Sequence, residues 1–410
     1  MTYKSDNISP NNFEECIKCT ICTAYCPVSA VNPSYPGPKQ AGPDGERYRL
    51  KKPSFYDEAL KYCLNCKRCE VACPSGVRVG DIIQSARIRY GKTRPSLRDR
   101  LLADTDFVGT LSSAFAPIVN PTLRTRPVKA LMHSVLGVDS HRQFPAYSSS
   151  RFTSWYRRHK QEQEKYTRHV AYFHGCYVEY NNPALGIDFV KIMNALGFGV
   201  RLLDKERCCG VAKIANGLID KARRDAEINI ESIRRADCPV LTTSSTCTLT
   251  MREEYPHLLG IDNSDVRESI QLAVRFIFSL IDRGEAKLVF RNDINETIAY
   301  HTPCHMSRLG WAIYPISLLK MIPGLTLRVL PQNCCGIAGT YGFKKENYEV
   351  SQQIGQKLFD SIAEFNPGSV ATDCETCKWQ IEMSTPYKVE NPISILARMI
   401  DFEKTRLANS

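Results

Sequence analysis

The sequence predicts an α+β protein with a small, mostly helical N-terminal part and two repeated α/β units behind it. Two cysteine runs with the same spacing stand in residues 16–27 and 63–74. After residue 168 the chain repeats a second cysteine pattern, and short apolar strands alternate with helical segments in both copies. With 410 residues there is room for several cores. We expect domains at 1–95, 169–290 and 291–410, joined by a linker at 96–168.

Composition limits the possible classes of protein. The chain has 18 cysteines, and its first 15 residues lack the apolar stretch of a secretory leader. We therefore expect a reducing compartment, where patterned cysteines indicate metal ligands or redox groups. The net charge of +11 admits nucleic acid, an anionic membrane or acidic proteins as partners.

The first pattern is a pair of tandem runs, CIKCTICTAYCP and CLNCKRCEVACP. Three cysteines at two-residue gaps can wrap one [4Fe–4S] cubane, and the fourth ligates the other cluster. Zinc favours separated ligand pairs, and disulfides need an oxidising compartment. The spacing therefore predicts a ferredoxin-type domain in which eight cysteines bind the iron atoms of two clusters. The expected ligands are Cys16, Cys19, Cys22 and Cys73 for cluster 1, and Cys63, Cys66, Cys69 and Cys26 for cluster 2.

Local composition predicts the elements around these runs. Proline and glycine favour a loop over residues 32–50, between the runs. Helical spacing of apolar residues predicts helices over 55–62 and 79–90.

The second pattern is an internal repeat. Cys176 and Cys304 lie 128 positions apart, and similar offsets relate the motifs CCGVA and CCGIA. Predicted strands at 169–173, 200–203 and 240–244 recur at 296–300, 325–330 and 370–373. Since each cysteine group follows a strand, parallel strands would bring the groups together at one sheet edge. The cysteines concerned are Cys176, Cys208, Cys209 and Cys247 in the first repeat, and Cys304, Cys334, Cys335, Cys374 and Cys377 in the second.

Adjacent cysteines can present two thiolates to one metal centre, because their Cα atoms lie too close for a relaxed disulfide. We expect Gly210 and Gly336 to remove a side chain where a cluster would sit. Cys238 has no counterpart and is expected to be structural. For His174, His301 and His305, which flank the cysteines, we expect packing or a hydrogen bond to a cluster sulfur.

The repeat resembles the CCG domain, the cysteine-rich domain of heterodisulfide reductases and related electron-transfer subunits. That motif is C, then CCG, then C-x2-C, and the second repeat matches it fully. In the first repeat Ser244 replaces the first cysteine of the last pair. The resemblance implies one additional non-cubane [4Fe–4S] cluster, on the second repeat. Whether the first repeat holds a cluster, lends ligands or holds none stays open.

The linker is basic. From Arg124 to Lys160 there are eight Lys/Arg residues and one acid, Asp139. Apolar residues at helical spacing predict an amphipathic helix over 128–136, followed by a basic aromatic cluster over 151–158. Either the linker contacts an anionic membrane peripherally, or it packs on the rest of the protein or on a partner subunit. The apolar segment 107–123 is broken by glycine, serine and proline, so we expect no membrane span. No nucleic-acid module accompanies the charge.

No Rossmann fingerprint, Walker loop or nucleophile–base pair is visible, so we expect no bound flavin, no catalytic residue and no substrate site. Over its whole length the sequence resembles the C subunits of anaerobic glycerol-3-phosphate dehydrogenases, notably in CIKCTICTAYCP, CCGIAGTYGFKKENY and TDCETCKWQIEMST. The resemblance implies a subunit that passes electrons from a flavin-containing A/B dimer to menaquinone in anaerobic respiration. It also implies a peripheral location at the cytoplasmic face of the inner membrane, with a role as anchor.

Three alternatives stay open. The chain could be the iron–sulfur subunit of a glycolate or lactate oxidase, or a heterodisulfide-reductase-like catalytic subunit. It could also be a membrane anchor whose clusters are only structural.

Overall fold

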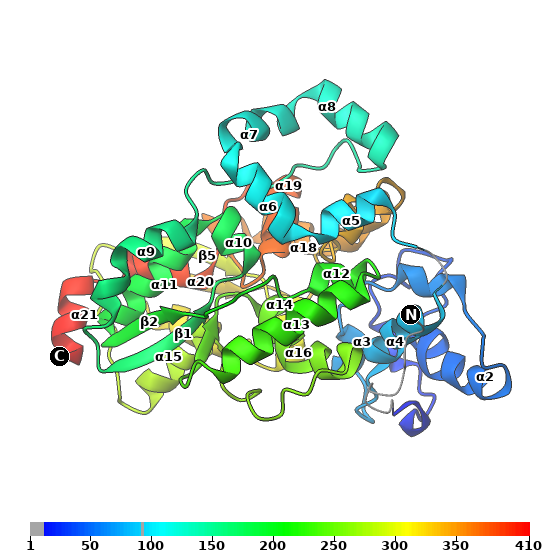
Figure 1. The fold of residues 1–410 in the computed structure, drawn as a ribbon, viewed down its shortest axis with the longest axis horizontal. Coiled ribbons are helices and arrows are strands. Elements are labelled where there is room, and N and C mark those ends of the chain that lie inside the picture. The colour runs from blue at the N-terminus through cyan, green and yellow to red at the C-terminus, as the bar shows by residue number, and fades with distance from the viewer. Residues whose placement is uncertain (1–11, 92–93) are drawn as a thin grey trace.

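The computed structural model describes residues 12–91 and 94–410. The segment 1–11, where we expected no secretory leader, lies outside the described residues. A helical N-terminal part lies beside two α/β units, and helices α7 and α8 form an arch that stands away from the rest (Figure 1). The predicted fold class is confirmed.

Each repeat forms a four-stranded parallel sheet with the same strand order. The first sheet runs β2-β1-β3-β4 and the second β6-β5-β7-β8. Equal order and equal register, with Val170 opposite Val200 and Ile298 opposite Leu327, are what a duplication produces. The strands are β1 (Arg168–Phe173), β2 (Phe198–Leu202), β3 (Val240–Thr242), β4 (Ile270–Leu272), β5 (Glu296–Tyr300), β6 (Leu325–Val329), β7 (Ser369–Ala371) and β8 (Val389–Glu390).

The two sheets share one hydrophobic core. Buried residues of both repeats, among them Phe189, Ile298 and Leu396, belong to a single cluster. Helices that alternate with the strands in the first repeat are α10 (Gly175–Tyr180), α11 (Pro183–Ala195), α12 (Val211–Ala215), α13 (Ile219–Arg234), α14 (Ser245–Leu249), the π-helix η6 (Thr250–Leu259) and α15 (Ala273–Asp282). Those of the second are α16 (Cys304–Leu309), α17 (Ile313–Lys320), α18 (Tyr348–Phe365), α19 (Glu375–Ser384), α20 (Pro392–Met399) and α21 (Phe402–Asn409). Because the core is continuous, the two repeats are placed as one body.

The N-terminal part contains α1 (Ile21–Ala24), α2 (Gly45–Lys51), α3 (Arg68–Val71) and α4 (Val79–Tyr90), with short turns η2 (Phe13–Glu15), η3 (Gln40–Asp44) and η4 (Glu58–Tyr62). Helix α4 has the predicted bounds. The loop predicted over 32–50 is wrong from Gln40 onward, where a π-helix leads into α2. Burial explains this, because Gly42 packs so closely on α4 that a Cβ there would lie 3.1 Å from a methyl group of Val79. The helix predicted over 55–62 is only a 3-10 turn, which Asp57 caps.

The linker has two parts with different surroundings. Helix α9 (Phe152–Gln163) packs on the first sheet, with Phe152 and Tyr156 buried and the Tyr156 hydroxyl donating to the carbonyl of Val200 at 2.7 Å. Arg142 is also buried and donates to Ser351 at 2.9 Å. The predicted basic aromatic cluster is therefore partly core, since its apolar faces meet the first repeat.

The other part of the linker leaves apolar side chains in contact with solvent. It comprises α5 (Leu97–Ala103), α6 (Thr105–Ala114), α7 (Ala116–Arg124), α8 (Arg126–Leu131) and η5 (Met132–Leu136). Its large exposed apolar residues are Leu97, Leu101, Phe107, Leu111, Phe115, Ile118, Leu131 and Val135. The helical conformation is interrupted at Phe115, between α6 and α7. No helix of the described residues is both long and apolar enough to cross a bilayer.

Candidate iron–sulfur centres

The two N-terminal cysteine loops have the same unusual backbone. Lys18 and Thr20 in the first loop have φ of 63° and 62°, and Asn65 and Lys67 in the second have 55° and 61°. Left-handed backbone in non-glycine residues costs about 1–3 kcal/mol each, so it persists only where surrounding interactions require it. The repeated strain bends both loops in the same way around their cysteines.

The eight cysteines come together in the two interleaved sets that the spacing predicts. Burial raises the pKa of Cys22, and the thiolates of Cys16, Cys73 and Cys19 raise it further. Burial likewise raises the pKa of Cys69, with further increases from Glu70 and from Cys66, Cys63 and Cys26. The last three cysteines and Cys69 line a cavity of about 20 Å³.

The residues present fit iron–sulfur clusters. No cysteine of the described residues forms a disulfide. Backbone N–H groups of Asn65 and Val77 donate to the sulfurs of Cys63 at 3.5 Å and Cys73 at 3.3 Å. Four thiols per centre, with N–H donors directed at sulfur, are the surroundings that [4Fe–4S] clusters have in proteins.

The cysteines of both repeats line one cavity of about 250 Å³. Each group follows the C-terminal end of a strand, as predicted, and the two sheets bring the groups face to face. Linker residues Leu101 and Val108 complete an apolar wall with Phe144 and Trp379. The cysteines that line it are Cys66, Cys176, Cys208, Cys209, Cys247, Cys304, Cys334, Cys335, Cys374 and Cys377.

The second repeat contributes five thiols that lie close together. The sulfurs of Cys335 and Cys377 are 3.3 Å apart, and the thiol of Cys304 contacts both Cys334 and Cys66. A hydrogen bond from Cys377 lowers the pKa of Cys374 to about 5 despite burial. Cys66, expected at cluster 2, is therefore next to the first cysteine of the second repeat.

The first repeat offers four thiols, and Ser244 is used otherwise. The sulfurs of Cys176 and Cys208 lie 3.8 Å apart, and Cys209 contacts Cys208 and Cys247. Ser244 caps α14 by accepting from the N–H of Cys247, and its hydroxyl donates to the carboxylate of Glu375 at 3.0 Å. Burial raises the pKa of Glu375 to about 8. Where the family motif has a cysteine, the first repeat thus has a serine that forms a hydrogen bond to the second repeat.

The glycines of the two CCG motifs allow a left-handed backbone conformation and do not make room for a cluster. Gly210 and Gly336 have φ of 87° and 86°, which favours glycine. A Cβ on Gly336 would lie 2.0 Å from the carbonyl oxygen of Ser351 on the next helix, and one on Gly210 would face Ala222. Our expectation that these positions face a cluster is wrong.

The three flanking histidines differ in their contacts. His174 lies 3.3 Å from Glu206, and His305 lies 3.3 Å from the hydroxyl of Thr246 and from the carbonyl of Asn65. His301 is fully buried, its ring nitrogens have no partner in the described part of the chain, and burial lowers its pKa to about 4. Cys238 lies outside both cysteine groups and is half-buried.

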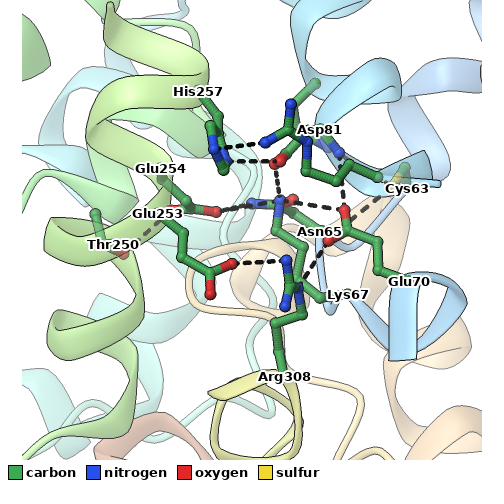
Figure 2. A network of polar contacts seen from close by, with 12 residues as sticks. Cys63, Asn65, Lys67, Glu70, Asp81, Thr250, Glu253, Glu254, His257 and Arg308 are labelled. Carbon is green, nitrogen blue, oxygen red and sulfur yellow. Dashed lines mark hydrogen bonds and ion pairs between the residues drawn. The ribbon is translucent and has the colours of Figure 1, made fainter. Parts of the chain in front are cut away.

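A buried charge network holds the second cysteine loop against both repeats (Figure 2). Lys67, between Cys66 and Cys69, pairs with Asp81 and lies 3.7 Å from both Glu70 and Glu254. Burial would lower the pKa of Lys67, but the three carboxylates raise it above its usual value. Arg308 of α16 donates to Glu70 at 2.9 Å, so all three parts of the chain meet here.

Comparisons with known proteins agree with this arrangement. Residues 12–77 match the 4Fe-4S dicluster domain family, and residues 170–252 and 298–382 each match the cysteine-rich domain family. The C subunit of the anaerobic glycerol-3-phosphate dehydrogenase of Escherichia coli is 55% identical over 397 residues, 96% of this chain and 100% of that protein. This chain belongs to the same family of dehydrogenase C subunits.

More distant relatives of this C-subunit family member span most of its length. The glycolate oxidase iron–sulfur subunit of Escherichia coli is 25% identical over 95% of this chain and 94% of its own. The D subunit of a dihydromethanophenazine:CoB–CoM heterodisulfide reductase from Methanosarcina barkeri is 24% identical over 94% of each chain. The combination of dicluster and cysteine-rich domains is therefore shared by several iron–sulfur subunits.

Sequence reasoning on this C-subunit family member missed Glu254 and Glu375 as parts of the site, and it did not predict the carboxylates that pair with Lys67. Lys67 and Glu254 are buried and lie 3.7 Å apart, and Glu375 accepts a hydrogen bond from the hydroxyl of Ser244 in the other repeat. Only the position of Lys67 between two motif cysteines gave a signal. Charged side chains are rarely buried unless paired, so a lysine inside a cluster loop could have prompted a search for carboxylates.

We expect Lys67→Met to destabilise the protein by about 3–5 kcal/mol, because three buried carboxylates lose the cation that they share. The measurement is urea unfolding of the cluster-loaded protein. Lys61→Met, at an exposed lysine in the same region, is the matched control and should change stability little. Equal losses in the two variants would contradict the role of the network.

Proposed function

We propose that this chain is the iron–sulfur electron-transfer subunit of an anaerobic glycerol-3-phosphate dehydrogenase. The contact between Cys66 and Cys304 carries the proposal, because it joins the predicted cluster 2 site to the second repeat. Clusters bound at these sites supply one-electron transfer. The name of the 55% identical relative supports the substrate and the existence of catalytic partner subunits.

Contacts of the chain's own residues support an order in which electrons would pass. Cys19 is exposed, so the cluster 1 site reaches the surface where a flavin-containing A/B dimer can dock. The exchange of Cys26 and Cys73 between the runs keeps the two N-terminal sites adjacent. Cys66 then lies against Cys304, and Cys334 against Cys304, at the rim of the shared cavity. The order is cluster 1, cluster 2, second repeat.

We assign two [4Fe–4S] clusters to the eight N-terminal cysteines and one non-cubane [4Fe–4S] cluster to the five cysteines of the second repeat. The five clustered thiols and the full family motif support the third centre. In the first repeat, Ser244 is bound to Glu375, which leaves four thiols that face the same cavity. We assign no flavin to this chain.

The acceptor we propose is menaquinone, reached at the cytoplasmic face of the inner membrane. Helix α6 supports this, because it contributes Val108 to the cavity wall and exposes Phe107 and Leu111 on its outer side. Residues 107–138 contain no acid, and Arg124 and Arg126 are exposed beside the apolar side chains. Basic and apolar groups together bind anionic membrane surfaces.

The test of the proposal uses the chain purified with its partner subunits. We expect glycerol 3-phosphate to reduce its clusters, seen by EPR, and glycolate and lactate to leave them oxidised. Reduction by glycolate or lactate instead would favour the related oxidases. Cys69→Ser is the control for electron transfer, because full substrate-to-quinone activity in that variant would mean that the clusters are only structural.

A second candidate is disulfide reduction, favoured by the placement of two cysteine groups around one cavity. This function would require that the isolated chain, reduced by a dye, turns over a disulfide substrate. We expect no turnover, because under the proposed function the chain passes electrons to a quinone and reduces no disulfide. Sustained turnover would move the chain to the catalytic class.

The iron content tests where the third centre lies. We expect about twelve irons in the wild type and about eight in Cys335→Ser, because that variant removes a second-repeat ligand. Cys209→Ser, the same change in the first repeat, should keep about twelve. A wild type with about eight irons, or a loss confined to Cys209→Ser, would contradict the assignment.

Membrane contact is tested by sedimentation with vesicles that contain anionic lipids. We expect Ile118→Asp combined with Val135→Asp to reduce binding at least tenfold, since both side chains are exposed, 67% and 70%, and apolar. Leu407→Asp, at a 72% exposed leucine in α21, is the matched control and should bind like the wild type. If the double variant still binds vesicles but no longer binds the partner subunits, the face is a protein interface instead.

A further inference from the structure

Tyr35 is a buried side chain whose hydroxyl has no hydrogen-bond partner within residues 12–91 and 94–410. Only 4% of the residue is exposed. A buried hydroxyl without a partner loses its hydrogen bonds to water and gains none in return. This hydroxyl is therefore available to donate to a group bound beside it.

The surroundings of Tyr35 identify that group. Tyr35 lines the small cavity that Cys26, Cys63, Cys66 and Cys69 enclose. These four cysteines are the proposed ligands of cluster 2, so whatever fills the cavity is their common ligand. The phenol stands in the wall of the cluster site itself.

The sequence position that matches Tyr35 after the second cysteine run carries no hydroxyl group. The two cysteine runs lie 47 positions apart, and 47 positions after Tyr35 stands Ile82. The proposed ligands of cluster 1 include one buried and one exposed cysteine, Cys22 and Cys19, whereas those of cluster 2 include two buried cysteines, Cys26 and Cys69, and none that is exposed. The chain thus surrounds its two clusters differently.

We propose that the Tyr35 hydroxyl donates a hydrogen bond to a sulfur of cluster 2 and thereby raises the reduction potential of that cluster. The inference rests on the iron–sulfur assignment made above. A reduced cluster carries one more negative charge, which burial disfavours and hydrogen-bond donors stabilise. Gln84 and the N–H of Asn65 already donate to the sulfur of Cys63, at 3.6 and 3.5 Å.

The donor has a consequence for the direction of electron flow. Burial by itself would make cluster 2 a poorer acceptor than the more exposed cluster 1. Tyr35 offsets this effect at the cluster that contacts the second repeat through Cys66. It is a residue that tunes the cofactor and leaves the ligand set unchanged.

The experiment compares Tyr35→Phe with Tyr25→Phe in the full-length protein. Tyr25 lies between Cys22 and Cys26 but is 57% exposed, so it controls for the loss of a phenol hydroxyl near the clusters. Redox titration followed by EPR should show a more negative midpoint potential for cluster 2 in Tyr35→Phe alone, with cluster 1 unchanged. ENDOR in H2O and D2O should show that the variant lacks one exchangeable proton coupled to cluster 2.

An unchanged potential together with an unchanged set of exchangeable protons overturns the inference. Loss of cluster 2 iron from Tyr35→Phe overturns it as well, because the hydroxyl would then be required for assembly rather than for tuning. The outcomes also separate this inference from the proposed function. A wild type without two cubane signals refutes the assignment of the clusters, whereas two cubanes that do not respond to Tyr35→Phe refute only the role of Tyr35.

Discussion

The placement of the second cysteine loop against both repeats depends on one buried positive charge. Lys67 stands between two proposed ligands of cluster 2 and is 2% exposed, so its charge must be met by carboxylates inside the protein. Asp81 comes from α4 and Glu254 from η6 of the first repeat, while Glu70 recruits Arg308 of the second repeat. Asn65 adds a 2.6 Å hydrogen bond to Glu254. The carboxylates that pair with Lys67 therefore hold the second cysteine loop against both repeats at once.

Duplication supplies the second constraint. Each repeat presents its cysteines at the C-terminal edge of its sheet, and the shared core turns the two edges toward each other. Direct bonds join them there, because both the N–H and the hydroxyl of Ser245 donate to the carbonyl of Asp373 at 3.0 Å. The cavity is nevertheless unequal. Ser244 stands where the second repeat has Cys374, so one half of the cavity offers five thiols and the other half four.

Local sequence patterns predicted what depends on spacing along the chain, and failed where distant segments decide. The cysteine runs, helix α4 and the first three strands of each repeat follow from motifs and periodicity over a few residues. The segment 32–50 has proline and glycine throughout, yet packing on α4 makes part of it helical. Strands β4 and β8, three and two residues long, were not predicted, and no cysteine group follows either of them to mark its end. Tyr35 has no neighbour in the sequence that marks it, because the cavity that it lines is formed by cysteines of both runs.

The linker joins the cavity to the exposed apolar face through a helix that is held firmly. A Cβ on Gly109 of α6 would lie 2.4 Å from the ring of Tyr180, so the helix approaches α10 as closely as glycine permits. Thr110 adds a hydroxyl contact to Tyr180 at 3.1 Å, and Arg151 donates to the carbonyl of Thr110 at 2.9 Å. Phe107 and Leu111 are thus exposed on an anchored helix rather than on a loose loop. A surface that binds them would lie about one helix diameter, ~10 Å, from the cavity that the cysteines line. Docking on this face and access to the cysteine-lined cavity are therefore properties of a single element, α6.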